Sequence, residues 1–222
     1  MPDSELAVSR REFLHNFAAI GALLPMACGA AEDDPFTALG PEVWRNSRKN
    51  GLVMIRHPAP TTITSQAKII PPGEAGEPLM VSGQVFAPDG KTTVSAITIY
   101  AYNTDAQGYY GENHQEYPPR LYGWMKSDDL GRFELHTIKP GRYPGMRVPA
   151  HIHFSLWGAG YPPQWVDELR FEGDSYLTAA MIAEDRARRE FATIRPLTRS
   201  SDGMLRCSFH IRLQSESNFS AK

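Results

Sequence analysis

The chain has 222 residues, enough for one domain of ordinary size with extensions. Hydrophobic residues make up 41% and charged residues 22%, as in soluble globular proteins, and 18 Gly with 18 Pro favour many strands and turns. The formal net charge of −2 comes from intermixed acids and bases without a basic stripe, which argues against nucleic acid as a partner.

The first 31 residues are interpreted as an export signal. Ser9-Arg10-Arg11-Glu12-Phe13-Leu14 has the order of a twin-arginine motif, and an apolar stretch follows to Ala31. Pro25 and the short length of this stretch argue against a membrane-spanning helix. An amphipathic N-terminal helix that begins with two arginines is the alternative. The signal predicts a periplasmic or extracellular protein.

The two cysteines, Cys28 and Cys207, are too few for a disulfide framework. Cys28 lies among small residues that offer several cleavage sites. Lipidation of Cys28 would attach the protein to a membrane, but Pro25 and Met26 make a poor lipidation sequence. Cys207 lies in an alternating, strand-like segment, so we expect a packed, inert thiol, with a catalytic nucleophile as the alternative.

Residues 32–78 are predicted to form an irregular N-terminal arm. The segment carries seven prolines and little periodicity. We expect it to wrap around the following domain or a neighbouring subunit. Residues 79–222 are expected to form the catalytic domain.

From Leu79 onward, short strands alternate with turns. Strands are expected at 80–86, 94–102, 122–126, 132–137, 151–157 and 205–213. Turns are expected at 88–91 and 128–131. One helix is expected at 177–190, with Glu184 and Arg188 spaced i,i+4. This pattern predicts an all-β fold, a β-sandwich with one or two short helices.

The segment Ala150-His151-Ile152-His153-Phe154 is the first candidate for chemistry. In a strand, alternate side chains share a face, so His151 and His153 point one way while Ile152 and Phe154 face the core. Both imidazoles can then converge on one metal ion. The H-x-H pattern alone is also found in zinc enzymes, cupins and plain surface strands.

Tyrosines near this strand strengthen the metal hypothesis. Pro140-Gly141 is expected to form a turn that projects Tyr143 from a loop end, held rigid by Pro144. Gly108 allows a sharp turn that directs one of the adjacent Tyr109 and Tyr110 inward. Phenolate binding requires a strongly Lewis-acidic ion, and ferric iron favours anionic oxygen and accepts imidazole. Two histidines with two tyrosines therefore point to iron(III).

Four motifs in order resemble those of the intradiol ring-cleavage dioxygenases, nearest to the protocatechuate 3,4-dioxygenase type. They are the Asp-Ala-x-Gly-x-Tyr loop at 105–110, the run Gly-x-Phe to Gly-x-Tyr-Pro at 131–144, Pro-Ala-His-Ile-His-Phe at 149–154 and Phe-Glu-Gly-Asp at 171–174. The resemblance extends from about Met80 to Leu213.

The resemblance implies a role for individual residues. The motif Gly-x-Tyr selects Tyr110 over Tyr109, and Tyr143 becomes the tyrosinate displaced when substrate binds. His151 and His153 complete an Fe(3+) ligand set. Arg147 resembles the arginine that stabilises negative charge on the bound catecholate.

Two departures from the family pattern concern residues around the metal. The family's arginine usually lies three residues before the first histidine, whereas Val148 intervenes here and puts the direction of Arg147 in doubt; a surface arginine paired with a carboxylate is the alternative. The family often carries a glutamine near the substrate, and this chain has Glu168 at the matching place.

The implied activity is iron(III)-dependent cleavage of a catechol-type, protocatechuate-like ring by O₂ to a cis,cis-muconate-type product. The partners expected are the catecholic substrate, O₂ and other subunits in a homo- or hetero-oligomer. No NAD, haem or flavin is expected, and no glycine-rich dinucleotide loop occurs. One alternative is a non-catalytic β-sandwich binding module. Another is a zinc hydrolase that adds His114 or His136 to His151 and His153.

Overall fold

The computed structural model describes residues 57, 59–114 and 118–216. The predicted export signal, Cys28 and most of the predicted arm lie outside these residues. Within the described ranges, no helix combines the length and apolar character needed to cross a bilayer.

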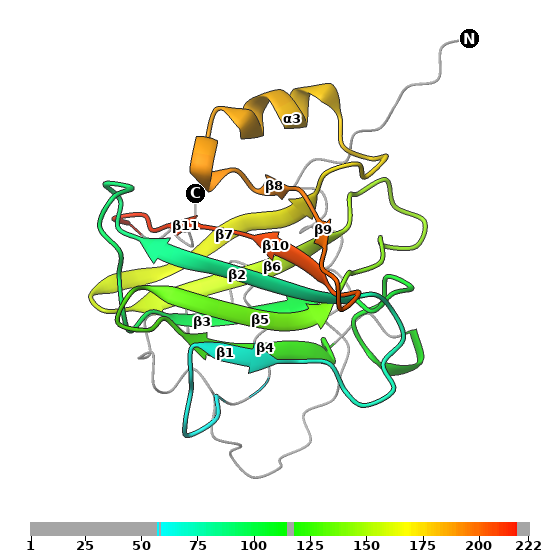
Figure 1. Ribbon diagram of the computed structural model, residues 1–222, viewed down its shortest axis with the longest axis horizontal. Coiled ribbons are helices and arrows are strands. Elements are labelled where there is room, and N and C mark those ends of the chain that lie inside the picture. The colour runs from blue at the N-terminus through cyan, green and yellow to red at the C-terminus, as the bar shows by residue number, and fades with distance from the viewer. Residues whose placement is uncertain (1–56, 58, 115–117, 217–222) are drawn as a thin grey trace, which may run out of the picture. The chain divides into compact units, whose positions relative to one another are not determined.

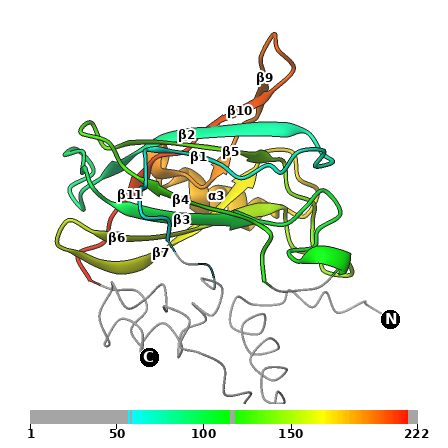
Figure 2. The ribbon, with the colours of Figure 1, turned by 90° about the horizontal axis from the view of Figure 1, so that it is seen from below.

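Two β-sheets packed face to face form the fold (Figures 1 and 2). The six-stranded sheet has the order β1 (Gln66–Lys68), β5 (Arg132–Ile138), β2 (Pro78–Phe86), β10 (Leu205–Ser208) and β9 (Thr198–Arg199), with β11 (Ile211–Arg212) also paired to β2. The five-stranded sheet has the order β4 (Leu121–Lys126), β3 (Thr98–Asn103), β6 (His151–Gly158), β7 (Tyr161–Phe171) and β8 (Ile194–Arg195). The prediction of an all-β sandwich is confirmed.

Short helices occupy the connections. These are η4 (Glu112–His114), α3 (Ala179–Arg186) and η5 (Arg189–Phe191). Helix α3 begins where the Thr178 hydroxyl accepts a hydrogen bond from the backbone N–H of Met181 at 3.2 Å. It is shorter than the predicted helix at 177–190, because Arg189 has a left-handed φ of 56° that a helix cannot continue.

Two predicted strands also differ in extent. The strand predicted at 94–102 begins only at Thr98, since Ala96 has a φ of 58°. The strand predicted at 205–213 is divided into β10 and β11. Between them the backbone of Phe209 presses on β2, and its carbonyl oxygen lies 1.8 Å from where a side chain on Gly83 would begin. Only glycine fits at that point of β2.

Four strands are absent from the sequence-based prediction: β1, β7, β8 and β9. Strand β1 lies in the segment predicted to be irregular and pairs in parallel with β5. Strand β7 is the longest of the described strands and pairs with β6. Pro162 and Pro163 near its start make it hard to predict, because proline is uncommon inside strands.

The hydrophobic core lies between the two sheets. From β6, Ile152 and Phe154 are fully buried in it. The Phe154 ring lies 6.2 Å from Phe133 on β5 and 5.2 Å from Phe209, which lies between β10 and β11. Cys207 is packed in the same core, as predicted, and burial raises the pKa of its thiol to about 12, which disfavours the reactive thiolate.

The alternation along β6 places His151 and His153 on the other face of the five-stranded sheet. Both are nevertheless buried, at 8% and 7% exposure, because β6 lies between β3 and β7 and is covered on both faces. The sandwich thus gives β6 one apolar face toward the core and one face for polar side chains.

Candidate functional site

Four side chains meet at one point on the outer face of β6. Tyr110 Oη lies 2.8 Å from His153 Nε2, and Tyr143 Oη lies 2.9 Å from His151 Nε2 and 3.3 Å from His153 Nε2. The two Nε2 atoms are 3.0 Å apart, and the two phenol oxygens are in direct contact. Two nitrogens and two oxygens from three separate segments thus converge on one another.

The orientation of His151 is fixed from its far side. Its Nδ1–H donates to the carbonyl of Pro149 at 2.7 Å, which leaves the Nε2 lone pair directed at the cluster. The pKa of His151 is lowered, because the effect of burial exceeds the opposing effect of the Glu168 carboxylate. The ring is therefore neutral at pH 7, which is the form that binds metals.

Tyr110 is held by a tight loop after β3. The Asp105 carboxylate accepts hydrogen bonds from the backbone N–H groups of Gln107 and Tyr109, both at 2.9 Å. The backbone N–H of Gly108 donates to the carbonyl of Asp105 at 3.1 Å. Tyr110 itself is 5% exposed and points into the cluster. Tyr109 instead lies against the ring of His114, with 4.4 Å between centroids.

An arginine fastens this loop to the rest of the fold. The backbone N–H of Arg120 donates to the carbonyl of Tyr110 at 2.9 Å, and its guanidinium contacts Asp105 at 3.3 Å. The same guanidinium makes a two-pronged bond with Glu74, which lies between β1 and β2. Such planar pairs restrict orientation as well as distance.

Tyr143 comes from a second loop, where the turn differs from the predicted one. The backbone N–H of Met146 donates to the carbonyl of Tyr143 at 3.3 Å, with Pro144 and Gly145 at the centre of the turn. Gly145 has φ of 75°, the conformation that a type II turn requires there. The turn is therefore at Pro144-Gly145 and not at Pro140-Gly141. Tyr143 is at the start of this turn and is partly exposed.

The two tyrosine loops dock on each other through their backbones. The N–H of Gly141 donates to the carbonyl of Asp105 at 2.8 Å, and the Thr104 hydroxyl donates to the carbonyl of Gly141 at 2.8 Å. A side chain on Gly108 would begin 1.9 Å from the carbonyl oxygen of Arg142. A side chain on Gly141 would begin 2.4 Å from the carbonyl oxygen of Ala106. The loops approach this closely only because both positions are glycine.

The Phe-Glu-Gly-Asp motif supports the start of β6. The Asp174 carboxylate accepts a hydrogen bond from the backbone N–H of Ala150 at 3.0 Å, next to His151. It also accepts one from the N–H of Tyr176 at 2.9 Å. The predicted motif thus has a structural role beside the cluster.

Arg147 does not reach the four-residue cluster. Its side chain is exposed, and its guanidinium carbon lies 5.7 Å from the centroid of the Tyr176 ring. Among the described residues, no hydrogen bond or ion pair joins Arg147 to the cluster or to a carboxylate. Val148, which separates Arg147 from Pro149, accounts for an arginine side chain that points toward Tyr176 and away from the cluster.

Aromatic side chains extend from the cluster along the outer face of the five-stranded sheet. Tyr102 stacks on His153 with 4.6 Å between centroids, and Trp165 lies 6.1 Å from His153. Tyr100 and Trp124 continue the row, 4.8 Å apart. Trp124 and its neighbours therefore form a wall beside the cluster rather than part of the core between the sheets.

No third histidine joins the pair in the described chain. His114 lies against Tyr109, and His136 is bonded to Glu134 on the other sheet at 2.6 Å. Within residues 57, 59–114 and 118–216, no group of three His, Cys, Asp or Glu side chains is placed to hold a metal ion. A metal centre at His151 and His153 would depend on the tyrosines.

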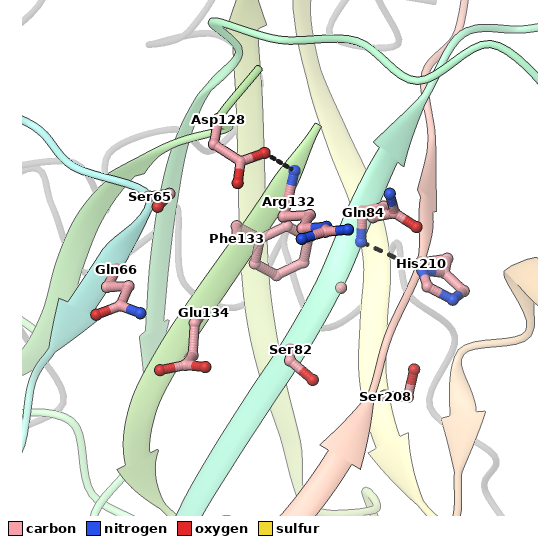
Figure 3. A pocket seen from close by; sticks show the side chains of 11 residues that line it. Ser65, Gln66, Ser82, Gln84, Asp128, Arg132, Phe133, Glu134, Ser208 and His210 are labelled. Atoms are coloured by element: carbon pink, nitrogen blue, oxygen red, sulfur yellow. Dashed lines mark hydrogen bonds between the residues drawn. The ribbon is translucent and has the colours of Figure 1, made fainter. Parts of the chain in front are cut away.

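A separate hollow of about 400 Å³ lies over the six-stranded sheet. Figure 3 shows Gln84, Arg132 and His210 among its lining residues, with His210 accepting from the backbone N–H of Gln84 at 3.2 Å. It contains neither tyrosine of the cluster and neither of its histidines. The chemistry of the side chains, and not the size of the hollow, identifies the site at β6.

The four-residue cluster suits a small, strongly Lewis-acidic cation. Bonds of about 2.0–2.2 Å from such an ion to nitrogen and oxygen place neighbouring donors about 3 Å apart, as the donors are here. Paired imidazoles and phenols that can ionise match ferric iron better than zinc, which binds phenolate less often.

Comparisons with known proteins agree with this picture. Residues 57–215 match the family model described as Dioxygenase. The 6-chlorohydroxyquinol 1,2-dioxygenase of Cupriavidus pinatubonensis (strain JMP 134 / LMG 1197) is 29% identical over 154 residues, 62% of this chain and 54% of that protein. The protocatechuate 3,4-dioxygenase beta chain of Burkholderia cepacia is 31% identical over 113 residues, 46% and 48% of the two chains.

The chain spans about half the length of these two relatives. Among solved structures, 3-chlorocatechol 1,2-dioxygenase from Rhodococcus opacus 1CP is similar in fold, with a TM-score of 0.54 at 19% identity over 79% of each chain.

The sequence alone did not reveal several residues that shape the site. Arg120 and Glu74 pair across 46 positions, a contact that no local pattern signals. Arg170 pairs with Glu168 on β7, a strand that the sequence did not predict. Asp174 belongs to the Phe-Glu-Gly-Asp motif, but the sequence did not indicate that its carboxylate would support the start of β6.

Replacing Gly108 by alanine is expected to separate the two tyrosine loops. The new methyl group would overlap the carbonyl of Arg142, in addition to the strain at a φ of 93°. We expect the free energy of unfolding in urea to fall by about 3 kcal/mol, at the upper end of overpacking costs. Gly145→Ala is the matched control, since it has a φ of 75° with nothing within 4 Å. It should cost only about 1–2 kcal/mol. Equal losses in the two variants would contradict the docking of the loops.

Proposed function

The chain belongs to the intradiol ring-cleavage dioxygenases, and from this membership we propose that it cleaves a catechol-type aromatic ring with O₂ by means of iron(III). Cleavage would fall between the two hydroxylated carbons and give a cis,cis-muconate-type product that contains both oxygen atoms of O₂. We propose a protocatechuate-like substrate, because the four sequence motifs resemble most those of the protocatechuate 3,4-dioxygenase type.

The convergence of two imidazole nitrogens and two phenol oxygens carries this proposal. The distances of 2.8–3.3 Å from the imidazole nitrogens to their neighbours in the cluster and the direction of the His151 lone pair support a role as ligands of one ion. We assign Tyr110, Tyr143, His151 and His153 as the four protein ligands. Iron(III) bound there would supply the Lewis acidity that lowers phenol pKa values and makes the catechol ring reactive toward O₂.

The two tyrosines differ in how firmly they are held. Tyr110 is buried, and its backbone is fixed by Arg120. Tyr143 is partly exposed and begins a turn on the outer loop. Tyr143 would therefore be the more mobile of the two tyrosines that hold the iron, and its phenolate oxygen would be placed to accept a proton from a substrate hydroxyl.

Neither alternative function accounts for the cluster as well. A binding module without catalysis would not need four ionisable side chains directed at one buried point, a costly arrangement without a ligand. A zinc hydrolase that uses a third histidine is disfavoured by the positions of His114 and His136, which lie elsewhere in the described fold.

The iron-loaded protein is expected to consume O₂ with a catechol. An oxygen electrode and a panel of catechol, protocatechuate and hydroxyquinol would measure this, with ¹⁸O₂ to trace both atoms into the product. We expect one O₂ per ring cleaved and loss of uptake after removal of iron by a chelator. Light scattering on the same preparation would report the proposed homo- or hetero-oligomer. No uptake with any of these catechols would exclude the proposed activity for this panel.

Iron bound by tyrosinate should make the protein burgundy, because phenolate-to-iron charge transfer absorbs visible light. Tyr143→Phe should shift and weaken this absorption band, since one of two phenolate ligands is lost. Tyr109→Phe is the matched control, because Tyr109 lies against His114 and outside the cluster. A spectrum that Tyr109→Phe changes and Tyr143→Phe does not would refute the ligand assignment.

We further propose that the protein is exported by the twin-arginine route to the periplasm or beyond. The order of residues in 9–14 supports this proposal. Replacing Arg10 and Arg11 together by lysine should retain the protein in the cytoplasm, as cell fractionation would show. Replacing Arg45 and Arg48 together by lysine, two changes of the same kind outside the motif, serves as the control and should leave export intact. Export that persists in the Arg10 and Arg11 variant would contradict this route.

A further inference from the structure

A β-bulge in β7 lies opposite His153. On both sides of the bulge the strands are paired residue for residue. The flanking pairs are Ile152–Leu169 and Phe154–Val166. Two residues of β7, Asp167 and Glu168, therefore face one residue of β6. Bulges beside functional sites redirect side chains in this way.

Arg170 lies on the same face as the four-residue cluster. It is the cross-strand partner of His151 in the β6–β7 pairing, and such partners have neighbouring side chains. The residues on either side of it, Leu169 and Phe171, are buried in the core between the sheets. Arg170 therefore points to the outer face, beside His151.

Glu168 holds Arg170 in place. Its carboxylate accepts a hydrogen bond from the Arg170 guanidinium at 2.9 Å, and the two side chains are only 15% and 25% exposed. The other carboxylate of the bulge, Asp167, is paired with Arg188. Each carboxylate thus has its own arginine, and the partner of Arg170 is Glu168.

One donor of Arg170 is left for a ligand. Its Nε–H is buried and has no hydrogen-bond partner within the described part of the chain. A buried cationic donor without an acceptor is costly. An anionic oxygen bound next to His151 would satisfy it.

The negative charges expected beside His151 when substrate is bound also favour a cationic side chain there. A catechol dianion brings two negative charges to the site, and Glu168 adds a third where related motifs often carry a neutral glutamine. The guanidinium of Arg170 offsets that third charge at 2.9 Å. Arg147 does not offset it, because it is exposed and lies over Tyr176.

We propose that Arg170, oriented by Glu168, is the residue that stabilises the negative charge of a bound catecholate in this protein, in place of Arg147. Arg170 donates to an anionic oxygen of the substrate, and Glu168 is its positioning residue. This inference rests on the proposed function, because it presupposes that a catecholate binds at the four-residue cluster.

Binding of 4-nitrocatechol to the iron-loaded protein without O₂ tests the proposal, with the change in visible absorbance as the readout. Arg170→Met should raise the Kd at least tenfold, and Arg170→Lys should recover part of the loss, because charge is restored without the planar fork. Arg147→Met should change the Kd less than twofold. Arg132→Met, on the outer face of the other sheet, controls for net charge.

Glu168→Gln separates positioning from simple packing. In the wild-type background it should weaken binding severalfold, because Arg170 loses its support. In the Arg170→Met background it should strengthen binding, because the negative charge of Glu168 beside the dianion is no longer offset by Arg170 and is removed by the substitution. The same sign in both backgrounds would overturn the assignment of Glu168. Iron content and thermal unfolding of each variant identify those that fail to fold, and Arg170→Lys then replaces Arg170→Met.

The outcomes also separate this inference from the proposed function. A wild-type protein that binds neither iron nor 4-nitrocatechol refutes the function itself. A wild-type protein that binds both, but loses affinity through Arg147→Met and not through Arg170→Met, refutes the inference alone.

Discussion

The contact between two loop backbones is the constraint on which the candidate site depends. Tyr110 and Tyr143 come from separate loops, and their phenol groups meet only because Gly108 and Gly141 let the carbonyls of the opposite loop approach. Hydrogen bonds from Gly141 and Thr104 then hold the loops together. The β-sandwich provides the rigid support, but the loop contact sets the distance between the two oxygens.

The two faces of β6 divide structure from chemistry. One face contributes Ile152 and Phe154 to the core, so the strand cannot shift by one residue without burying its histidines between the sheets. The other face carries the two histidines, and on the same side of the sheet the neighbouring strands contribute the aromatic row and the Glu168–Arg170 pair. The register that packs the core therefore also fixes the site, and stability and chemistry constrain the same strand.

What could be predicted from the sequence follows from the range of each interaction. The alternation around His151 and His153 is local, and the structure places both side chains as the alternation requires. The choice of Tyr110 over Tyr109 needed the family spacing, since either tyrosine satisfies local geometry. Strand β7 was missed because two prolines begin it and because its bulge interrupts the alternation that marks a strand. Arg170 was missed with it.

Strand β2 bears on how the chain reaches this fold. It lies between β5 and β10, and its end also pairs with β11, so Leu79 is joined to Leu205 across most of the described chain. Pairings between such distant residues close slowly, because a long loop must lose its entropy first. Until Leu205 has been synthesised, one edge of β2 has no partner, and open edges invite aggregation. Folding of the sandwich is therefore completed only after β10 and β11 have left the ribosome, and a product truncated before β10 would be an aggregation hazard rather than a smaller sandwich.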